Sequence, residues 1–304
     1  MPAPAPDVPP LRGPGGSPLD APVVVACSGG PDSLGLLVLA ARDALDPIAV
    51  HVNHGLRPGA AAEAQVVHEA ANRLGVRARS VSVRVTPGPN LEARAREARY
   101  DALEAARVES GATALLTAHT ADDHAETVLL NLLRGSGLSG LAGIPAVHGT
   151  VVRPVLGLRR DELRAVAATL DVVPVDDPSN RDEAHRRNWV RHTVLPLLAE
   201  GAGRDLVPVL TRQAAVMAED AALLDALADE LLEAAGRAEP EVAVLRAAPP
   251  ALVRRALRRW IGPPWPSLAE LARLDAVVAG ERRAAELEGG RRVSRHGGRL
   301  TRTG

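Results

Sequence analysis

The stretch from Val23 to Ser33 constrains the fold more than any other part of the chain. The run Val23–Ala26 is typical of a buried parallel strand, and it is interrupted at Gly29, Gly30 and Pro31 before an apolar helical pattern begins. A strand that turns directly into a helix directs backbone N–H groups and the positive end of the helix dipole at whatever lies beyond it. Two interpretations fit: a phosphate-binding loop, or a Gly-Pro turn that only starts a helix.

The basic residues restrict how such a loop could hold phosphate. All 36 residues of the combined Lys and Arg count are arginine, so the chain has no lysine. A Walker A loop, a protein kinase and a Schiff-base enzyme each need a lysine, and all three are therefore excluded. A phosphate at this loop would be bound by backbone N–H groups, hydroxyls, a metal ion and arginine.

The single cysteine excludes several kinds of site, and the chain has no sequence signal for a membrane or for secretion. Cys27 cannot form an internal disulfide, a Cys-x-x-Cys zinc site or an iron–sulfur ligand set, and its place at a strand end is typical of a small buried apolar residue. No apolar run approaches the ~18 residues of a membrane span, and no signal peptide is evident. We expect a disordered tail over residues 1–21, a cytoplasmic protein and no membrane partner.

Strand and helix patterns alternate over the first two thirds of the chain. Apolar or alternating segments predict strands over residues 48–52, 77–85, 114–119 and 151–152. Amphipathic segments between them predict helices over residues 60–74, 90–110, 120–133 and 161–170. This alternation predicts an α/β fold with a doubly wound, mostly parallel sheet. Ligands bind beyond the carboxyl ends of such strands, and polar side chains collect there, at Ser28 to Ser33, at Asn53 and His54, and from His119 onward.

The pattern changes near residue 201. Long helical segments follow, including residues 213–235, and the last stretch is either a small hairpin or a frayed tail. Residues 201–250 hold 4 arginines against 9 acidic residues, whereas residues 251–304 hold 12 arginines against 5. We therefore predict one domain over residues 22–203 and a smaller, mainly helical domain with a basic C-terminal end over 204–304.

Two carboxylates stand out after the predicted strand over residues 114–119. Asp123 and Glu126 are three residues apart, so they share one face of a helix, one turn from its start. Acidic residues there stabilise any helix N-terminus, which is the simpler interpretation. Their position at a strand end favours the alternative, in which they hold magnesium or orient and deprotonate an amine.

Several segments resemble one family. The run from Ser28 to Ser33 resembles the pyrophosphate-binding loop of N-type ATP pyrophosphatases, and within that group His51 to Arg57 resembles the His-x-Asn-His-x-Leu-Arg stretch of tRNA(Ile)-lysidine synthetases. Four more segments are similar to the same family, at residues 90–100, 118–127, 134–141 and 177–191. The resemblance covers roughly residues 23–196, in order.

The resemblance implies a two-step ligation. ATP adenylates carbon 2 of the wobble cytidine in the CAU anticodon of an isoleucine tRNA, and the ε-amine of free L-lysine then displaces AMP. It implies Mg²⁺ beside ATP, with Asp32 orienting the metal ion and Asp123 and Glu126 binding or deprotonating lysine or sharing the metal. The expected nucleotide site is Ser28, Gly29, Gly30, Pro31, Asp32, Ser33, His51, Asn53, His54 and His119, and the expected tRNA or phosphate contacts are Arg94, Arg96, Arg99, Arg134, Asn188, Arg191, Arg254 and Arg258.

Departures from the family pattern leave some points open. His124 stands where members often have glutamine, and the chain resembles a short form without the large C-terminal domain. Arg254, Arg255, Arg258 and Arg259 place positive charge on one helix face, which is either an RNA contact or an ordinary solvated face. The oligomeric state, monomer or homodimer, also stays open.

Three other functions are alternatives to this ligation. A tRNA thiolase would use the same adenylation, but it relays sulfur through paired cysteines, and amidotransferase-type relatives need a glutaminase partner. A non-catalytic nucleotide-sensing or tRNA-binding module would be expected to have lost its carboxylates, whereas Asp32, Asp123 and Glu126 are present.

Overall fold

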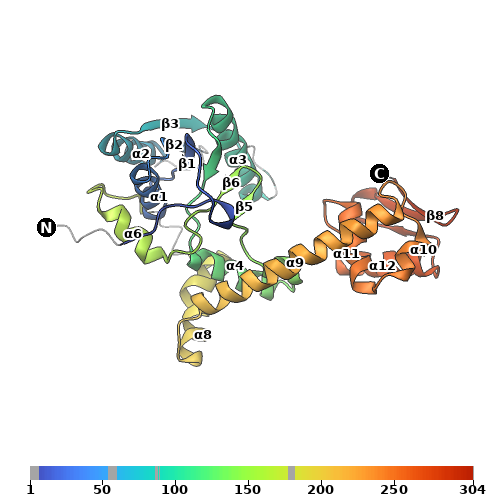
Figure 1. Cartoon of the computed structure of the whole chain (residues 1–304). Coiled ribbons are helices and arrows are strands. Elements are labelled where there is room, and N and C mark those ends of the chain that lie inside the picture. Colours follow the sequence, from blue (N-terminus) through green and yellow to red (C-terminus); the bar gives the residue numbers. More distant parts are fainter. Residues whose placement is uncertain (1–6, 54–59, 86–87, 89, 177–181, 304) are drawn as a thin grey trace. The chain divides into compact units, whose positions relative to one another are not determined.

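The computed structural model describes residues 7–53, 60–85, 88, 90–176 and 182–303 (Figure 1). The chain forms two compact units, residues 1–214 and 215–304. The predicted boundary, between residues 203 and 204, falls in the turn before helix α9 (Val207–Ala235). The two units divide within α9, between residues 214 and 215, and the helix runs across this point without a break.

Unit 1 is built on a six-stranded sheet with the order β3-β2-β1-β4-β6-β5. All neighbours are parallel except the short edge strand β5, which runs antiparallel to β6. The prediction of a doubly wound, mostly parallel sheet is confirmed. The strands are β1 (Val23–Ala26), β2 (Pro47–Asn53), β3 (Arg77–Ser82), β4 (Ala114–Leu116), β5 (Val147–His148) and β6 (Val151–Val152).

Helices cover both faces of this sheet because side chains alternate along β1. Val23 and Val25 pack with residues of α1 (Pro31–Arg42), α2 (Ala60–Leu74) and α6 (Arg160–Ala168), whereas Val24 packs on the opposite face with α3 (Leu91–Glu109). All three valines are fully buried. β1 is therefore apolar on both faces, which is typical of a strand in the middle of a sheet that helices cover on both sides.

A glycine sets the distance between α1 and α6. A Cβ at Gly35 would stand 2.4 Å from the carbonyl oxygen of Leu163 and 2.9 Å from its Cδ1. The two helices can approach this closely because residue 35 has no side chain. The contact matters for the site, since α6 begins with Arg160.

The N-terminal segment is ordered, contrary to the prediction. Residues 7–21 were expected to be disordered, but Val8 and Leu11 are buried in the main core. Arg42 donates hydrogen bonds to the carbonyl oxygens of Val8 and Pro9, and the Leu11 N–H donates to Asp43. Two apolar side chains and these hydrogen bonds provide the order that Pro-rich composition does not reveal.

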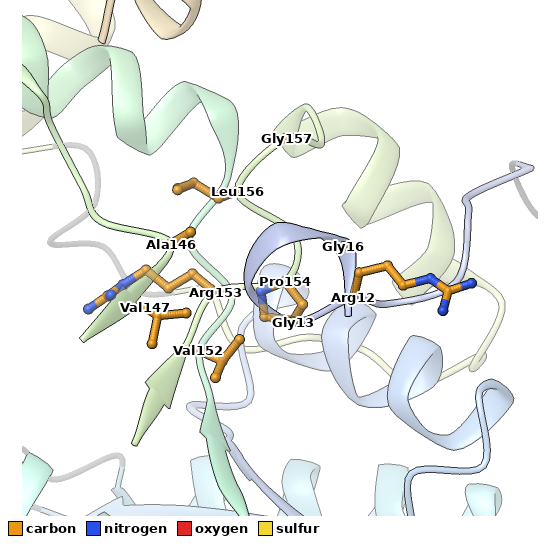
Figure 2. A pocket seen from close by; sticks show the side chains of 10 residues that line it. All are labelled: Arg12, Gly13, Gly16, Ala146, Val147, Val152, Arg153, Pro154, Leu156 and Gly157. Carbon is orange, nitrogen blue, oxygen red and sulfur yellow. The ribbon is translucent and has the colours of Figure 1, made fainter. Parts of the chain in front are cut away.

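This segment also encloses a small hollow beside β5 and β6. The hollow has a volume of about 240 Å³, and Arg12 and Arg153 lie on opposite sides of it (Figure 2). Arg12 and Gly13 come from the N-terminal segment, and Val147 and Val152 come from the sheet. The N-terminal segment thus covers the β5 side of the sheet.

The rest of unit 1 is helical. Helix α4 (Ala121–Leu133) follows β4, and Val207 of α9 is buried against Ala121 and Ala125. The remaining elements are α5 (Leu138–Leu141), α7 (Arg186–Trp189), the π-helical turn η3 (Val190–Val194) and α8 (Leu195–Ala202). The last three follow one another directly, and α7 and η3 both contact α4.

Unit 2 contains helices and a small sheet that the sequence analysis did not foresee in full. Its second core is formed by α9, α10, α11, α12 and three antiparallel strands in the order β7-β8-β9. Of the two alternatives for the chain end, the hairpin is the one formed, by β8 and β9. The elements are α10 (Val242–Ala247), α11 (Pro250–Ile261), α12 (Leu268–Ala279), β7 (Ala284–Glu286), β8 (Arg292–His296) and β9 (Arg299–Thr303). Among the described residues, no helix combines the length and apolar character needed to cross a membrane.

Candidate active site

The loop between β1 and α1 is shaped for an anion. Gly29 has φ of 81°, and a Cβ there would stand 2.8 Å from Cγ2 of Val175. Gly30 is the N-cap residue of α1 and provides no side-chain cap, and Ser33 donates through Oγ to the Gly30 carbonyl at 2.9 Å. The first-turn N–H groups of α1 are therefore left without a side-chain cap, as an anion site requires.

Ser28 and Ser33 hold the loop closed. The Ser28 N–H donates to Ser33 Oγ at 3.2 Å, and the two hydroxyl oxygens are 3.4 Å apart. Both hydroxyls lie on the loop, where they could donate to a phosphate oxygen together with the backbone. Burial raises the pKa of the neighbouring Cys27 thiol to about 12, so this side chain is a neutral thiol at physiological pH.

Asp32 lies in the first turn of α1 and faces two arginines of α6. Its carboxylate is 3.4 Å from Arg164 Nε and 3.8 Å from Arg160 Nε. Burial raises the pKa of Asp32, and the two guanidiniums oppose this shift. The close packing of α6 on α1 at Gly35 places these cations beside the loop.

Asp123 uses its two carboxylate oxygens for different tasks. Oδ2 accepts hydrogen bonds from the N–H and the hydroxyl of Thr120, both at 2.9 Å, and this capping box starts α4. Oδ1 faces three guanidiniums, those of Arg160, Arg187 and Arg191 at 3.0 to 3.3 Å. The helix-cap interpretation of Asp123 therefore applies, and Oδ1 remains directed at the arginines.

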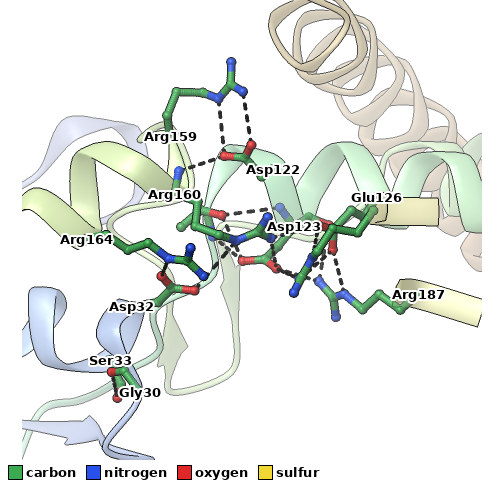
Figure 3. Close-up of polar contacts among 12 residues, drawn as sticks. Gly30, Asp32, Ser33, Asp122, Asp123, Glu126, Arg159, Arg160, Arg164 and Arg187 are labelled. Atoms are coloured by element: carbon green, nitrogen blue, oxygen red, sulfur yellow. Dashed lines mark hydrogen bonds and ion pairs between the residues drawn. The ribbon is translucent and has the colours of Figure 1, made fainter. Parts of the chain in front are cut away.

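Glu126 is the buried centre of an arginine cluster (Figure 3). Its side chain is 1% exposed, and it accepts hydrogen bonds from Arg160, Arg187 and Arg191 at 2.7 to 3.0 Å. Arg160 begins α6, Arg187 lies on α7 and Arg191 on η3. One carboxylate thus ties three segments together at the N-terminal end of α4.

The charges of this cluster set the protonation states of its members. Burial alone would raise the pKa of Asp123, but Arg187, Arg160 and the Thr120 hydrogen bonds lower it to about 2. Burial acts on Glu126 in the same way, and the arginines again lower its pKa. Both carboxylates are ionised at neutral pH, and the pKa of Arg160 is raised by the same partners against its own burial.

Asn53, His51 and His119 lie in or just after strands of the sheet. His51 is buried within β2, two residues before its last residue, with Nδ1 3.1 Å from the carbonyl oxygen of Cys27 and with no partner for Nε2 among the described residues. Burial lowers the pKa of His119 to about 4, so it is neutral at physiological pH. Asn53 is the last residue of β2, and His54 lies outside the described residues.

Some of the predicted tRNA or phosphate contacts lie near Asp123 and Glu126, and others lie elsewhere. Arg191 joins the cluster, and Arg96 is near enough to His119 to act on its pKa, while Arg96 and Arg99 stack on Tyr100 at 5.1 and 5.4 Å. Asn188 is buried and donates to the Asp182 carbonyl. Arg134 is the C-cap of α4, at the opposite end of that helix from Asp123 and Glu126, Arg94 lies on α3, and Arg254 and Arg258 belong to unit 2.

Three arginines that contact Asp32, Asp123 or Glu126 had no predicted role: Arg160, Arg164 and Arg187. Arg160 and Arg164 carry no motif signal, and Arg187 was quoted only as part of a family segment. A weak signal exists, since Arg159-Arg160 directly starts a helix that follows the strand β6. Arg187, on α7, follows no strand and has no such signal.

The fold and the loop between β1 and α1 define a PP-loop domain that uses ATP. Residues 17–198 match the PP-loop domain family, and residues 241–301 match the TilS substrate binding domain family. A tRNA(Ile)-lysidine synthase of Nocardia farcinica is 44% identical over 261 residues, which cover 84% of this chain and 81% of the relative. The chain belongs to the tRNA(Ile)-lysidine synthase family, ligases that form carbon–nitrogen bonds.

A second relative agrees with this assignment, and a solved structure agrees with the fold. A tRNA(Ile)-lysidine synthase of Salinispora arenicola is 42% identical over 300 residues, covering 92% of this chain and 90% of the relative. Among solved structures, the U34-tRNA thiolase NcsA of Methanococcus maripaludis superposes with a TM-score of 0.56 at 18% identity, covering 69% of this chain and 76% of that chain. The second comparison supports the fold.

Proposed function

We propose that this chain joins free L-lysine to carbon 2 of the wobble cytidine in the CAU anticodon of an isoleucine tRNA. In the first step the oxygen on carbon 2 attacks the α-phosphorus of ATP and pyrophosphate leaves. In the second step the ε-amine of lysine attacks carbon 2, loses a proton, and AMP leaves with that oxygen. A single arrangement supports this proposal: Arg160 bridges the anion-binding loop, through Asp32, to Asp123 and Glu126.

The loop suits the first step. Developing charge on the leaving pyrophosphate would be stabilised by the uncapped N–H groups of α1 and by the hydroxyls of Ser28 and Ser33. The Ser28 N–H bond to Ser33 Oγ holds the two serines together, and the Ser33 hydroxyl, which donates to the Gly30 carbonyl, would turn to donate to a phosphate oxygen. This role for Gly29, Gly30 and Ser33 follows from the same geometry.

One carboxylate beside the loop could bind a magnesium ion together with ATP. Among the described residues, no three acidic or histidine side chains gather as a metal cage. Mg²⁺ typically binds one or two carboxylates together with substrate phosphates and water, and Asp32 supplies one carboxylate next to the loop. Bound there, the ion would neutralise phosphate charge.

The carboxylates suit recognition of lysine better than proton abstraction. The ammonium of free lysine has a pKa near 10.4, and a carboxylate whose pKa is about 2 is a weak base for it. Two ionised carboxylates instead attract the ammonium. Since guanidiniums occupy Glu126, at least one of Arg187 and Arg191 must turn away when lysine binds, and the phosphates of ATP are suitable partners for it.

The decisive experiment is incorporation of lysine into RNA. The protein is incubated with ATP, Mg²⁺, radiolabelled lysine and a transcript of isoleucine tRNA with the CAU anticodon, and the RNA is then counted. We expect label only when ATP is present and only in the transcript that carries this anticodon. A folded protein that incorporates no label, or that incorporates it without ATP, would refute the proposed function.

A further inference from the structure

The helix face that the sequence marks as basic is largely neutralised within unit 2. Arg254 lies 2.9 Å from Asp275, Arg255 lies 2.6 Å from Asp225, and Arg259 contacts Asp229. Arg258 stacks on the ring of Trp265 at 5.4 Å. Positive charge available to a partner must therefore be sought elsewhere in this unit.

A second group of arginines surrounds an open hollow. The hollow has a volume of about 580 Å³ and is lined by Arg246 of α10, Arg295 of β8 and Arg299 of β9, with Glu241 as its one acidic lining residue. No ion pair joins these three arginines to a carboxylate within the described residues. Three guanidiniums against one carboxylate leave the lining with an excess of positive charge. We refer to it as the three-arginine pocket.

Two of these guanidiniums are held close together. A Cβ at Gly280 would stand 2.5 Å from Arg246 Nη2 and 2.7 Å from Arg295 Nη1, so these nitrogens are at most about 5.2 Å apart. Gly280 ends α12 with φ of 90°, a conformation that favours glycine. Like charges at this distance repel unless an anion lies between them.

The backbone fixes the pocket in place. Arg246 donates through Nε to the carbonyl oxygen of Val278, and Arg299 donates to that of Glu239 at 3.0 Å. Val242 donates its N–H to the carbonyl oxygen of Gly298, which joins the β8–β9 turn to the start of α10. The Arg246 and Arg299 side chains are thus anchored at one nitrogen each, and their other nitrogens remain for a ligand.

The turn at the rim leaves room for a phosphate. Gly297 and Gly298 both have positive φ and join β8 to β9. A two-residue turn of this kind needs residues without a Cβ, and it lets a ligand backbone approach closely. The pocket therefore combines convergent guanidiniums with an open rim.

We infer that the three-arginine pocket binds a phosphodiester of the tRNA backbone, an inference that rests on the proposed function. Guanidiniums in a fork arrangement match the geometry of phosphate oxygens. The excess positive charge repels cations and favours a polyanion. The pocket, rather than the paired arginines of α11, then provides the main electrostatic contact of unit 2 with RNA.

The test compares two double variants of the full chain. Replacing Arg295 and Arg299 by glutamine removes two phosphate contacts. The slope of log K against log salt should fall by about 2, and the affinity for the CAU isoleucine tRNA at 0.15 M salt should fall about 10- to 30-fold. The control Arg237→Gln with Arg292→Gln removes the same net charge, but these arginines are paired with carboxylates. We expect its tRNA affinity to stay within about twofold of wild type.

Each outcome decides the inference. Equal affinity and equal salt slope in the two double variants would overturn it. Should the pocket variant fail to fold, Glu241→Gln tests the same site, since loss of the one lining carboxylate should tighten tRNA binding about two- to fivefold; unchanged binding would overturn the inference. Lysine incorporation by the wild type is measured separately, so failure of the proposed function is distinguishable from failure of the pocket.

Discussion

Replacing Glu126 by glutamine should strongly destabilise unit 1. The side chain is 1% exposed, and its two oxygens accept hydrogen bonds from Arg160, Arg187 and Arg191. Glutamine preserves the volume but removes one of the two carboxylates that all three guanidiniums contact, the other being Asp123. Breaking a buried ion pair from one side costs about 3–5 kcal/mol. For a unit of this size 1 kcal/mol corresponds to roughly 2–4 °C, so the melting temperature should fall by about 6–20 °C.

The assay is calorimetric unfolding of the full chain with a matched surface control. Glu69 pairs with Arg73 at 2.8 Å one helical turn away, and its side chain is 54% exposed. Glu69→Gln removes a carboxylate of the same type and should cost at most about 0.5 kcal/mol. If Glu126→Gln melted within 2 °C of Glu69→Gln, the argument that Glu126 holds the cluster together would be wrong.

Three further predictions concern the same unit. The pKa of Asp123 is lowered to about 2 in the folded state, so its carboxylate should contribute about 2–3 kcal/mol to the free energy of unfolding. This contribution is fully present above about pH 4 and is lost as the pH falls towards 2. The variant Asp123→Asn should therefore lack this part of the acid unfolding profile. Gly35→Ala should cost about 1–3 kcal/mol in urea unfolding, despite the better helix propensity of alanine, because its Cβ would meet the Leu163 backbone; Gly157→Ala, with open space around it, is the control. Asp32→Asn should lower ATP-dependent pyrophosphate release about a hundredfold with a melting temperature close to wild type; activity near that of wild type would exclude a role for this carboxylate.

The sequence predicted the sheet well because β-branched runs and helical patterns are local signals. Val23–Ala26 is apolar on both faces, and this property alone indicates a central parallel strand. The same local signals did not reveal order in residues 7–21. Val8 and Leu11 are two isolated apolar residues among prolines, and their contacts lie more than 30 residues away, on Arg42 and Asp43.

The site was predicted in part for the same reason. Asp123 and Glu126 follow a strand directly, and their spacing shows that they share a helix face. The arginines that hold Glu126 lie 34 to 65 residues further along the chain, so no periodicity connects them. Asp123 also shows that a helix cap leaves one carboxylate oxygen for other contacts, since Oδ2 caps α4 and Oδ1 faces the arginines.

The cations that hold Asp123 and Glu126 are guanidiniums, and the chain contains no lysine. A guanidinium stays protonated at any pH at which the protein is folded, so it cannot act as a nucleophile. An activated carbon held beside this cluster would meet no ε-amine belonging to the chain. With the proposed function, the arrangement would thus protect the enzyme from ligating its own side chains to RNA.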